Sequence, residues 1–155
     1  MSGLAMVEQS VSEGKEFLTF ILGEEIYGLG IGCVREIIGM QAITPLPDVP
    51  AYIEGVINLR GRVIPVLCVR QRMNMPLVER NSRTCIIVVR IQDETVGLIV
   101  DTVSEVIRIP DNKIEPAPRM AMGGAHYLAG LGNVDEKVRL LLDVEALLGA
   151  PRSAA

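Results

Sequence analysis

Short runs of apolar residues, separated by polar turns, predict β-strands over most of this chain. Several of these runs come in pairs around a turn of two or three residues, a pattern typical of hairpins. The pairs are residues 16–22 with 26–31, 52–59 with 62–69, 84–91 with 95–100, and 130–134 with 137–142. Strands this short, at near-regular spacing, favour a mainly β fold built as small barrels or sandwiches.

Helical patterns in the sequence are brief. Residues 33–38 place three aliphatic side chains at helical spacing and predict a single turn. A short helix is also expected at the start of residues 70–82, before a polar connection. Asp143 can cap a last helix over residues 144–148, which we expect to end at Gly149 because a proline follows.

The second half of the chain resembles the first. Residues 27–38 match residues 96–107 at an offset of 69, with five of twelve positions identical. Residues 52–69 match residues 127–144 at an offset of 75, with six of eighteen positions identical. Matches that occur in the same order predict a duplicated structural unit, and chance agreement between aliphatic strands is the alternative.

Chain length agrees with this organisation, because 155 residues fit one domain or two small lobes that share contacts. We expect one domain over residues 16–150, with lobes at about 16–80 and 83–150. Loose tails are expected at residues 1–15 and 151–155. The composition is 49% hydrophobic with no Trp and five Phe or Tyr residues, so the core must be aliphatic, which suits strands.

Composition also bears on the compartment. No apolar run approaches the ~18 residues of a membrane-spanning helix, and the N-terminus lacks the basic and apolar regions of a secretory signal. Three widely spaced cysteines fit neither a disulfide framework nor a zinc site. A cytoplasmic location is the expectation that follows.

Charge is unevenly distributed along the chain. The net charge is −4, but residues 60–90 hold seven arginines and one acid, so this stretch is +6 and the remainder −10. A basic stretch can suit nucleic acid. The acidic whole and the lack of interleaved aromatic residues argue against that partner. A surface that meets acidic groups of a protein is favoured, with plain solvation as the alternative.

The sequence gives only weak signals for catalytic residues. His126 is the only histidine, so it offers no cluster for a metal, and we expect it in a solvated loop. The glycine run at residues 28–32 lacks the third glycine and long helix of a dinucleotide-binding fingerprint. Asp101 and Glu105 could form an acid–base pair, but Glu105 has a repeat partner in Glu36, which favours a role in the fold or on a doubled surface. We expect no enzymatic activity, cofactor or metal.

Several motifs together resemble the CheW family of chemotaxis coupling proteins. The central one reads Gly-Val-Ile-Asn-Leu-Arg-Gly at residues 55–61 and continues as Val-Ile-Pro-Val at 63–66. Other blocks similar to the family, in the same order, are residues 16–39, 96–106, 114–118 and 127–132. The resemblance spans roughly residues 15 to 150.

This resemblance implies a fold of two packed five-stranded SH3-like β-barrel subdomains with short helices. It also implies a non-enzymatic adaptor that links the cytoplasmic tip of chemoreceptors to the regulatory domain of the histidine kinase CheA in chemotaxis signal transduction. Such a protein is monomeric on its own and joins membrane-associated receptor arrays, without binding nucleic acid or inserting into the membrane. The alternative is a CheW-like adaptor of another chemosensory pathway, such as one controlling pili or surface motility.

The resemblance places a receptor-binding groove between the subdomains, with aliphatic walls and a polar rim. Arg60 lies at the tip of an apolar hairpin, where it can pair with Glu36 or with an acid of the partner. The residues carried over to this groove are Ile31, Val34, Glu36, Ile37, Asn58, Leu59, Arg60, Val100 and Val103.

Kinase-binding residues are expected at the ends of the lobes. The resemblance points to Gly55, Val56, Pro116, Pro118 and Met120. Two positions in this region depart from the family pattern. Glu115 stands where a basic residue is common, and Met120 stands where an aromatic residue is common, which puts an array-closing contact there in doubt.

Overall fold

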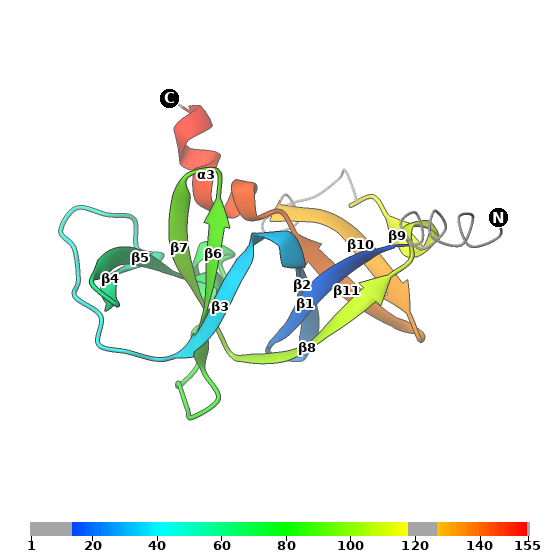
Figure 1. The fold of residues 1–155 in the computed structure, drawn as a ribbon, viewed down its shortest axis with the longest axis horizontal. Helices are drawn as coiled ribbons and strands as arrows, with labels where there is room; N and C mark the ends of the chain where they lie inside the picture. The colour runs from blue at the N-terminus through cyan, green and yellow to red at the C-terminus, as the bar shows by residue number, and fades with distance from the viewer. Residues whose placement is uncertain (1–13, 118–126, 155) are drawn as a thin grey trace.

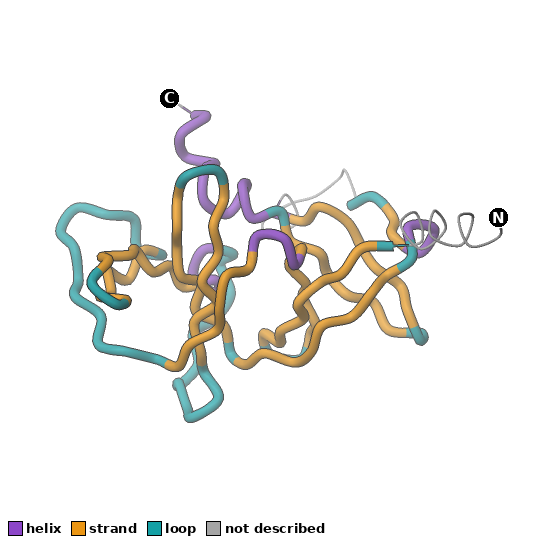
Figure 2. The backbone as a smooth tube through the Cα atoms, in the orientation of Figure 1, coloured by secondary structure: helices purple, strands orange, loops and turns teal. Residues whose placement is uncertain are grey.

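The computed structural model describes residues 14–117 and 127–154 of the chain, which form two β-sheets side by side with short helices (Figures 1 and 2). One sheet has the strand order β8-β1-β2-β11-β10-β9 and the other β3-β6-β7-β5-β4. We call them the six-stranded and the five-stranded sheet. The strands are β1 (Lys15–Leu22), β2 (Glu25–Gly30), β3 (Val34–Gly39), β4 (Ile53–Leu59), β5 (Arg62–Cys68), β6 (Cys85–Ile91), β7 (Glu94–Val100), β8 (Thr102–Ile109), β9 (Ile114–Glu115), β10 (Leu128–Val134) and β11 (Lys137–Leu142).

The predicted fold class is confirmed: the structure is mainly β, in two sheets, with few short helical segments. The six-stranded sheet has one strand more than expected, the short β9, and in the described residues no pairing closes either sheet into a full barrel. The helical segments are η1 (Ile31–Cys33), α2 (Val69–Arg72), η2 (Asp111–Lys113) and α3 (Val144–Ala154).

The repeat is visible in the order of the elements, but the two halves exchange their first hairpins. The β1–β2 hairpin of the first half pairs with β8 and β11 of the second half. The β6–β7 hairpin of the second half pairs with β3 and β5 of the first. The lobes expected at about residues 16–80 and 83–150 are therefore not the two sheets, because each sheet takes strands from both halves.

Two glycines of the repeat lie where the exchanged hairpins join the sheets by parallel pairing. Gly28 is opposite Leu141 and Gly97 is opposite Val66, and these pairs are equivalent under the repeat offsets. A Cβ atom on Gly97 would lie 2.7 Å from methyl carbons of both Val66 and Ile86. Glycine at these positions allows the hairpin of one half to approach the strand of the other.

The exchange builds a large hydrophobic core that belongs to both halves, which we call the shared core. Its buried residues include the repeat-related pairs Leu18/Ile87, Phe20/Val89, Leu29/Leu98, Leu67/Leu142 and Val69/Val144. A lobe of this size alone would bury a lower fraction of its surface than a larger domain and would be marginally stable. Packing the two halves on one core compensates for that deficit.

Each sheet also has a smaller core of its own, and the two are unequal. The five-stranded sheet encloses seven buried aliphatic residues, whereas the six-stranded sheet encloses Phe17, Ile109 and Leu141. The repeat partner of Ile64 is Arg139, whose side chain is buried and donates hydrogen bonds to the carbonyl oxygens of Val134 and Lys137. A polar residue in place of an aliphatic one thus leaves the small core of the six-stranded sheet with fewer apolar side chains.

The helical turn predicted for residues 33–38 is wrong. These residues form strand β3 after the single 3-10 turn η1. β3 pairs with β6 from Val34 to Gly39, and a bulge between Val34 and Glu36 shifts the alternation. That shift makes the apolar spacing resemble a helix, and pairing with a buried strand outweighs the local pattern.

The last helix begins as predicted but ends later. Asp143 accepts a hydrogen bond from the backbone N–H of Ala146 at 3.2 Å, which confirms the predicted cap. α3 then continues past Gly149 to Ala154, so residues 151–154 are helical instead of part of a tail. Residue 151 is a proline and offers no N–H to the carbonyl of Leu147. Arg72 replaces that donor, because its Nε donates to the Leu147 carbonyl oxygen at 2.8 Å.

Arg72 also joins the two halves directly. Its guanidinium carbon lies 4.2 Å from the ring centroid of Tyr52 and 4.9 Å from that of Tyr127. These tyrosines are repeat partners, so one arginine stacks between equivalent aromatic rings of the two halves.

Gly97→Ala tests the close approach of the exchanged hairpin. The added methyl group meets two stiff β-branched side chains, so we expect the free energy of unfolding in urea to fall by about 1–3 kcal/mol. Gly30→Ala is the matched control, because no atom lies within 4 Å of its Cβ position and its φ of −56° suits alanine. Equal stability of the two variants would contradict this account.

Candidate functional site: the seam between the sheets

The edge strands β3 and β8 expose an apolar strip beside the shared core. In Figure 1, β3 descends to the left of β1 and β2, whereas β8 runs along their lower right. Val34 pairs with Val89, and its repeat partner Val103 pairs with Phe20. Because paired residues of neighbouring strands share a face, both valines lie on the side of the shared core.

The same face carries the more exposed members of this strip. Ile37 pairs with Ile87 and is 44% exposed, and its repeat partner Val106 pairs with Leu18 and is 50% exposed. Ile31 of η1 packs half-buried against the same core. We define the seam strip as Ile31, Val34, Ile37, Val103 and Val106.

An ion pair lies on the opposite face of β3. Glu36 is opposite Val88, so its side chain points toward the small core of the five-stranded sheet. Arg60 donates a hydrogen bond to the carboxylate of Glu36, and the pairing predicted between these residues is confirmed. Their side chains are 69% and 31% exposed, so the pair lies at the surface.

The turn between β4 and β5 sets the position of Arg60. Arg60 and Gly61 have φ angles of 53° and 87°, as a two-residue hairpin turn with left-handed residues requires. The Asn58 side-chain oxygen accepts a hydrogen bond from the Gly61 N–H at 2.9 Å and closes the turn. Asn58 therefore supports the geometry that presents the arginine.

The residues predicted for one groove thus fall into two sets. Ile31, Val34, Ile37 and Val103 lie along the seam strip. Glu36, Asn58, Leu59 and Arg60 lie around the β4–β5 turn, and Leu59 is buried there at 8% exposure. The two sets are separated by the thickness of strand β3.

Val100 and Val106 change the predicted residue set. Val100 is 1% exposed within the shared core, so it supports the surface from beneath and is not available as a groove wall. Val106 was missed by sequence reasoning. The repeat offset of 69 that relates Val34 to Val103 also relates Ile37 to Val106, and it was the signal that could have identified this residue.

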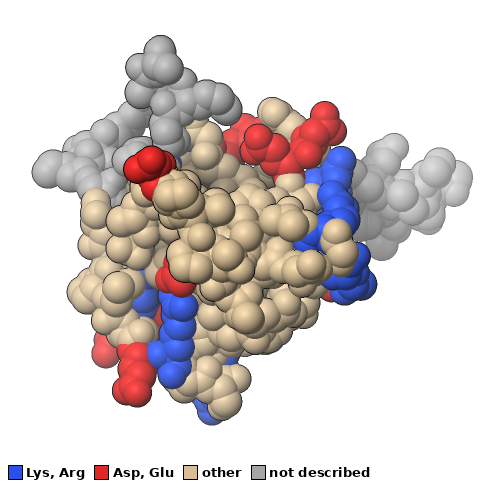
Figure 3. All heavy atoms as spheres, turned by 90° about the vertical axis from the view of Figure 1, so that its left-hand side faces the viewer, with Lys and Arg blue, Asp and Glu red and all other residues tan. Residues whose placement is uncertain are grey.

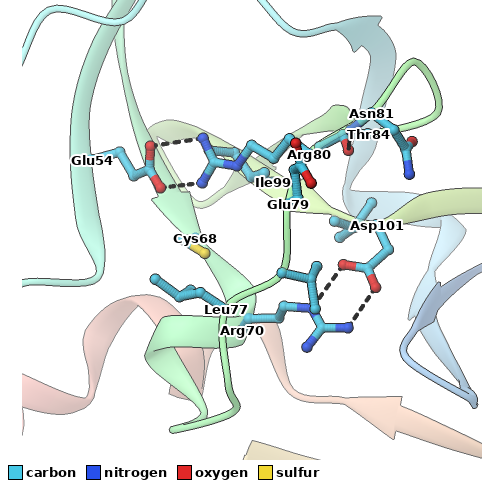
Figure 4. Close-up of a pocket in the computed structure, with 12 residues that line it drawn as sticks. Glu54, Cys68, Arg70, Leu77, Glu79, Arg80, Asn81, Thr84, Ile99 and Asp101 are labelled. Carbon is cyan, nitrogen blue, oxygen red and sulfur yellow. Dashed lines mark hydrogen bonds and ion pairs between the residues drawn. The ribbon is translucent and has the colours of Figure 1, made fainter.

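Apart from the seam strip, a hollow of about 370 Å³ lies beside the five-stranded sheet under the connection to β6 (Figure 4). Arg70 of α2 forms a bidentate ion pair with Asp101, with distances of 2.8 Å from Nε and 2.6 Å from a terminal nitrogen. The Arg70 side chain is 9% exposed. Asp101 also accepts the backbone N–H of Gly23 at 2.9 Å, and Arg70 donates to the Pro76 carbonyl oxygen at 2.6 Å. This network ties together α2, the β1–β2 turn and the end of β7.

A second ion pair lies in this hollow. Arg80 donates through both terminal nitrogens to the two carboxylate oxygens of Glu54, as Figure 4 shows. Leu77 and Val78 on the connection are 59% and 50% exposed. Because the two ion pairs satisfy their own charges, we interpret the hollow in Figure 4 as a structural feature that holds the connection to β6 against the sheet.

The electrostatics do not favour acid–base chemistry at Asp101 and Glu105. The hydrogen bonds and charge of Arg70 hold the pKa of the Asp101 carboxyl below its ordinary value, despite the opposing effect of burial. A carboxylate held ionised is a poor proton acceptor near neutral pH. Glu105 is exposed on β8, where its backbone N–H and C=O both bond to the Thr19 hydroxyl. Those two bonds bridge the bulge in the β1–β8 ladder.

The predicted kinase-binding residues that the structure describes lie at opposite ends of the molecule. Gly55 and Val56 are on β4, the outer strand of the five-stranded sheet, and Pro116 follows β9, the outer strand of the other sheet (Figure 1). Gly55 is buried, Val56 is half-buried and Pro116 is exposed. Pro118, Met120 and His126 lie outside the described residues.

Neither a metal site nor a spanning helix is found in the described parts of the chain. No group of three or more His, Cys, Asp or Glu residues in residues 14–117 and 127–154 could hold a metal ion. No helix in those same ranges is long and apolar enough to cross a membrane. An apolar strip with charged neighbours, displayed by two edge strands, suits contact with another protein.

Comparison with known proteins identifies the family. A family model described as the CheW-like domain matches residues 16–152. The chemotaxis protein CheW of Klebsiella aerogenes is 39% identical, with 99% of this chain and 95% of that protein aligned. The chemotaxis protein CheW of Helicobacter pylori is 31% identical, over 91% of this chain and 86% of that protein.

A solved structure gives the same result. The scaffolding protein TtCheW from Thermoanaerobacter tengcongensis is 37% identical and superposes with a TM-score of 0.82, over 86% of this chain and 92% of that one. This chain belongs to the CheW family. The comparisons support the chemotaxis interpretation of the sequence and not the alternative of a pathway controlling pili.

Asp101→Asn tests the buried ion pair and its pH dependence. Removing the carboxylate leaves Arg70 buried without its counter-charge, so we expect the free energy of unfolding at neutral pH to fall by about 3 kcal/mol. The Asp101 pKa is lower in the folded than in the unfolded protein. The stability that the ionised Asp101 contributes is therefore present above the ordinary carboxyl pKa of 3.8. This stability is lost as the pH falls through the pKa of Asp101 in the folded protein.

Denaturation measured from neutral to strongly acidic pH checks this expectation. The stability difference between wild type and Asp101→Asn should shrink as the pH falls below about 4. Asp93→Asn is the control, because Asp93 is fully exposed and lies 3.6 Å from Arg90, so its loss should change little. A difference that stays constant across the acid range would contradict the assigned role of Asp101.

Proposed function

We propose that this protein is a non-enzymatic adaptor that couples chemoreceptors to the histidine kinase CheA in chemotaxis. Membership of the CheW family supports this proposal, since its relatives include proteins named for chemotaxis and a protein named as a scaffold. The observation that carries it is the seam strip, an exposed aliphatic surface on two edge strands above the shared core.

The seam strip is proposed as the contact for the cytoplasmic tip of the receptors. A helical tip presents apolar side chains at successive turns, and a strip of valine and isoleucine between two strands can receive them. Ile37 and Val106 are the exposed anchors, and the half-buried Val34 and Val103 form the floor. The Glu36–Arg60 pair provides a polar rim on the opposite face of β3.

The kinase regulatory domain is proposed to bind at the outer ends of the sheets. Gly55 and Val56 on β4 lie at the opposite end of the fold from Pro116 after β9, so these residues do not form one patch (Figure 1). Two such ends allow two different neighbours, which is what an extended array requires. Cytoplasmic association with membrane-bound receptor arrays, and a monomer in isolation, complete the proposal.

Val106→Lys tests receptor binding at the seam strip. A charge on this anchor must be desolvated against aliphatic side chains, so we expect retention of a receptor-tip fragment to fall at least about tenfold, or ~1.4 kcal/mol. Val138→Lys is the matched control, because Val138 is 49% exposed and is separated from β8 by β2 and β1 in the sheet. Pull-down with the organism's receptor tips and kinase regulatory domains measures both variants.

Arg60→Asp complements this pair of variants. It places a second carboxylate beside Glu36 and should lower receptor retention while the protein stays folded, as judged by thermal unfolding. Equal losses of receptor retention in Val106→Lys and Val138→Lys would contradict the proposal that the seam strip binds the receptor. Failure of the wild-type protein to retain either partner would overturn the adaptor function itself.

A further inference from the structure

The basic stretch at residues 60–90 is dispersed by the fold into different environments. Arg70 and Arg80 are engaged in ion pairs, and Arg72 stacks between two tyrosines. Arg60, Arg62 and Arg90 instead gather with Arg35 at one mouth of the five-stranded sheet. In this last group, several guanidinium groups lie together around one hollow.

These four arginines surround a hollow of about 390 Å³, which we call the arginine basin. Its walls come from β3, the β4–β5 turn and the β6–β7 hairpin, and its apolar floor consists of Leu59, Ile64 and Val88, all under 9% exposed. Glu36 is the single acid among its lining residues. Four positive side chains and one negative leave the lining at +3.

The charges in the basin are poorly compensated. Arg90 lies 3.6 Å from Asp93, a fully exposed residue of the hairpin turn, and Arg35 donates to the carbonyl oxygen of Gly32 at 3.2 Å. Arg62 has no ion pair or hydrogen bond from its side chain among the described residues. Glu36 engages Arg60 alone.

The repeat shows that this concentration of charge is not a requirement of the fold. At the equivalent mouth of the six-stranded sheet, Arg35 is replaced by Ser104 and Arg60 by Asp135. Arg90 is replaced by Ile21, and Lys137 stands at the position of Arg62. The floor residue Ile64 corresponds to Arg139, which is buried and donates to carbonyl oxygens of its own hairpin. The two mouths share a backbone plan, so only one copy has acquired the basin.

We infer that the arginine basin binds acidic side chains of a partner protein, with Glu36 as an internal competitor for Arg60. Guanidinium groups form paired hydrogen bonds with carboxylates, and an incoming carboxylate would neutralise the excess charge. This inference deepens the proposed function and rests on it, since the Glu36–Arg60 pair belongs both to the rim of the proposed receptor contact and to the basin. It assigns the partner an acidic segment beside its apolar anchors.

The surface favours a short acidic segment over a nucleic acid. On the face shown in Figure 3, basic atoms form separate patches on a largely uncharged surface. No aromatic residue lines the basin to stack with a base. A hollow of this volume suits a few side chains, whereas a nucleic-acid backbone needs a continuous basic track.

The test is a titration of the full-length protein with a short peptide that carries three adjacent glutamates. A peptide of equal length with glutamines in their place, and a single-stranded oligonucleotide, are the comparison probes. Side-chain Nε–H signals of the arginines in NMR spectra report the site of binding. We expect the glutamate peptide to shift the signals of Arg35, Arg60, Arg62 and Arg90, and to leave those of Arg83 and Arg108 unchanged.

Charge-removing variants distinguish peptide binding at the basin from general electrostatic attraction to the protein. Arg62→Gln combined with Arg90→Gln should weaken peptide binding about fivefold, the upper range for exposed ion pairs. Lys137→Gln, at the equivalent mouth, should have no effect. Glu36→Gln should strengthen binding about twofold to threefold, because it frees Arg60 from its internal partner.

Several results would overturn the inference. These are equal binding of the glutamine peptide, equal weakening by Lys137→Gln, weaker binding after Glu36→Gln, and tighter binding of the oligonucleotide at the same arginines. The titration needs neither receptor nor kinase. Failure of the basin is therefore distinguishable from failure of the adaptor function in the pull-down.

Discussion

Burial of the shared core is the constraint on which the rest of this structure depends. A half of about 65 residues would be only marginally stable alone, because small folds bury a lower fraction of their surface than larger ones. The exchange of hairpins places β1–β2 and β6–β7 back to back around a common set of aliphatic side chains. Gly28 and Gly97 permit this arrangement at the two points where the exchanged hairpins pair in parallel with strands of the other half.

The edge strands acquire their functional character from that core. β3 and β8 lie at its margin, so their inward residues are held in position while their neighbours face solvent. Aliphatic residues at such a margin form a pre-organised surface, because the buried side chains below them already fix the strand geometry. Arg70 with Asp101, and Arg72 between Tyr52 and Tyr127, fix the junctions on which the core rests.

The sequence allowed part of this arrangement to be predicted. Hairpins followed from local alternation, and the Arg60–Glu36 pair from a turn arginine near a repeated glutamate. Strand β3 was mistaken for a helical turn, because a bulge alters the period on which such predictions rely. The exchange of hairpins was invisible, since equivalent strands of two similar halves satisfy the same pairing rules. The Arg70–Asp101 pair joins residues far apart in the chain, and no local pattern connects them.

The exchanged hairpins bear on how such a chain could have arisen. A single half, with one hairpin, one edge strand and a second hairpin, would have its first hairpin unpaired within its own sheet. Two identical copies could satisfy each other by trading that hairpin, which makes a symmetric dimer of the domain-swapped kind. Joining the two copies through the connection at residues 73–84 would preserve every pairing while releasing the copies from identity. The arginine basin on one side and Arg139 on the other are what such a fused pair can accumulate once its symmetry no longer has to be maintained.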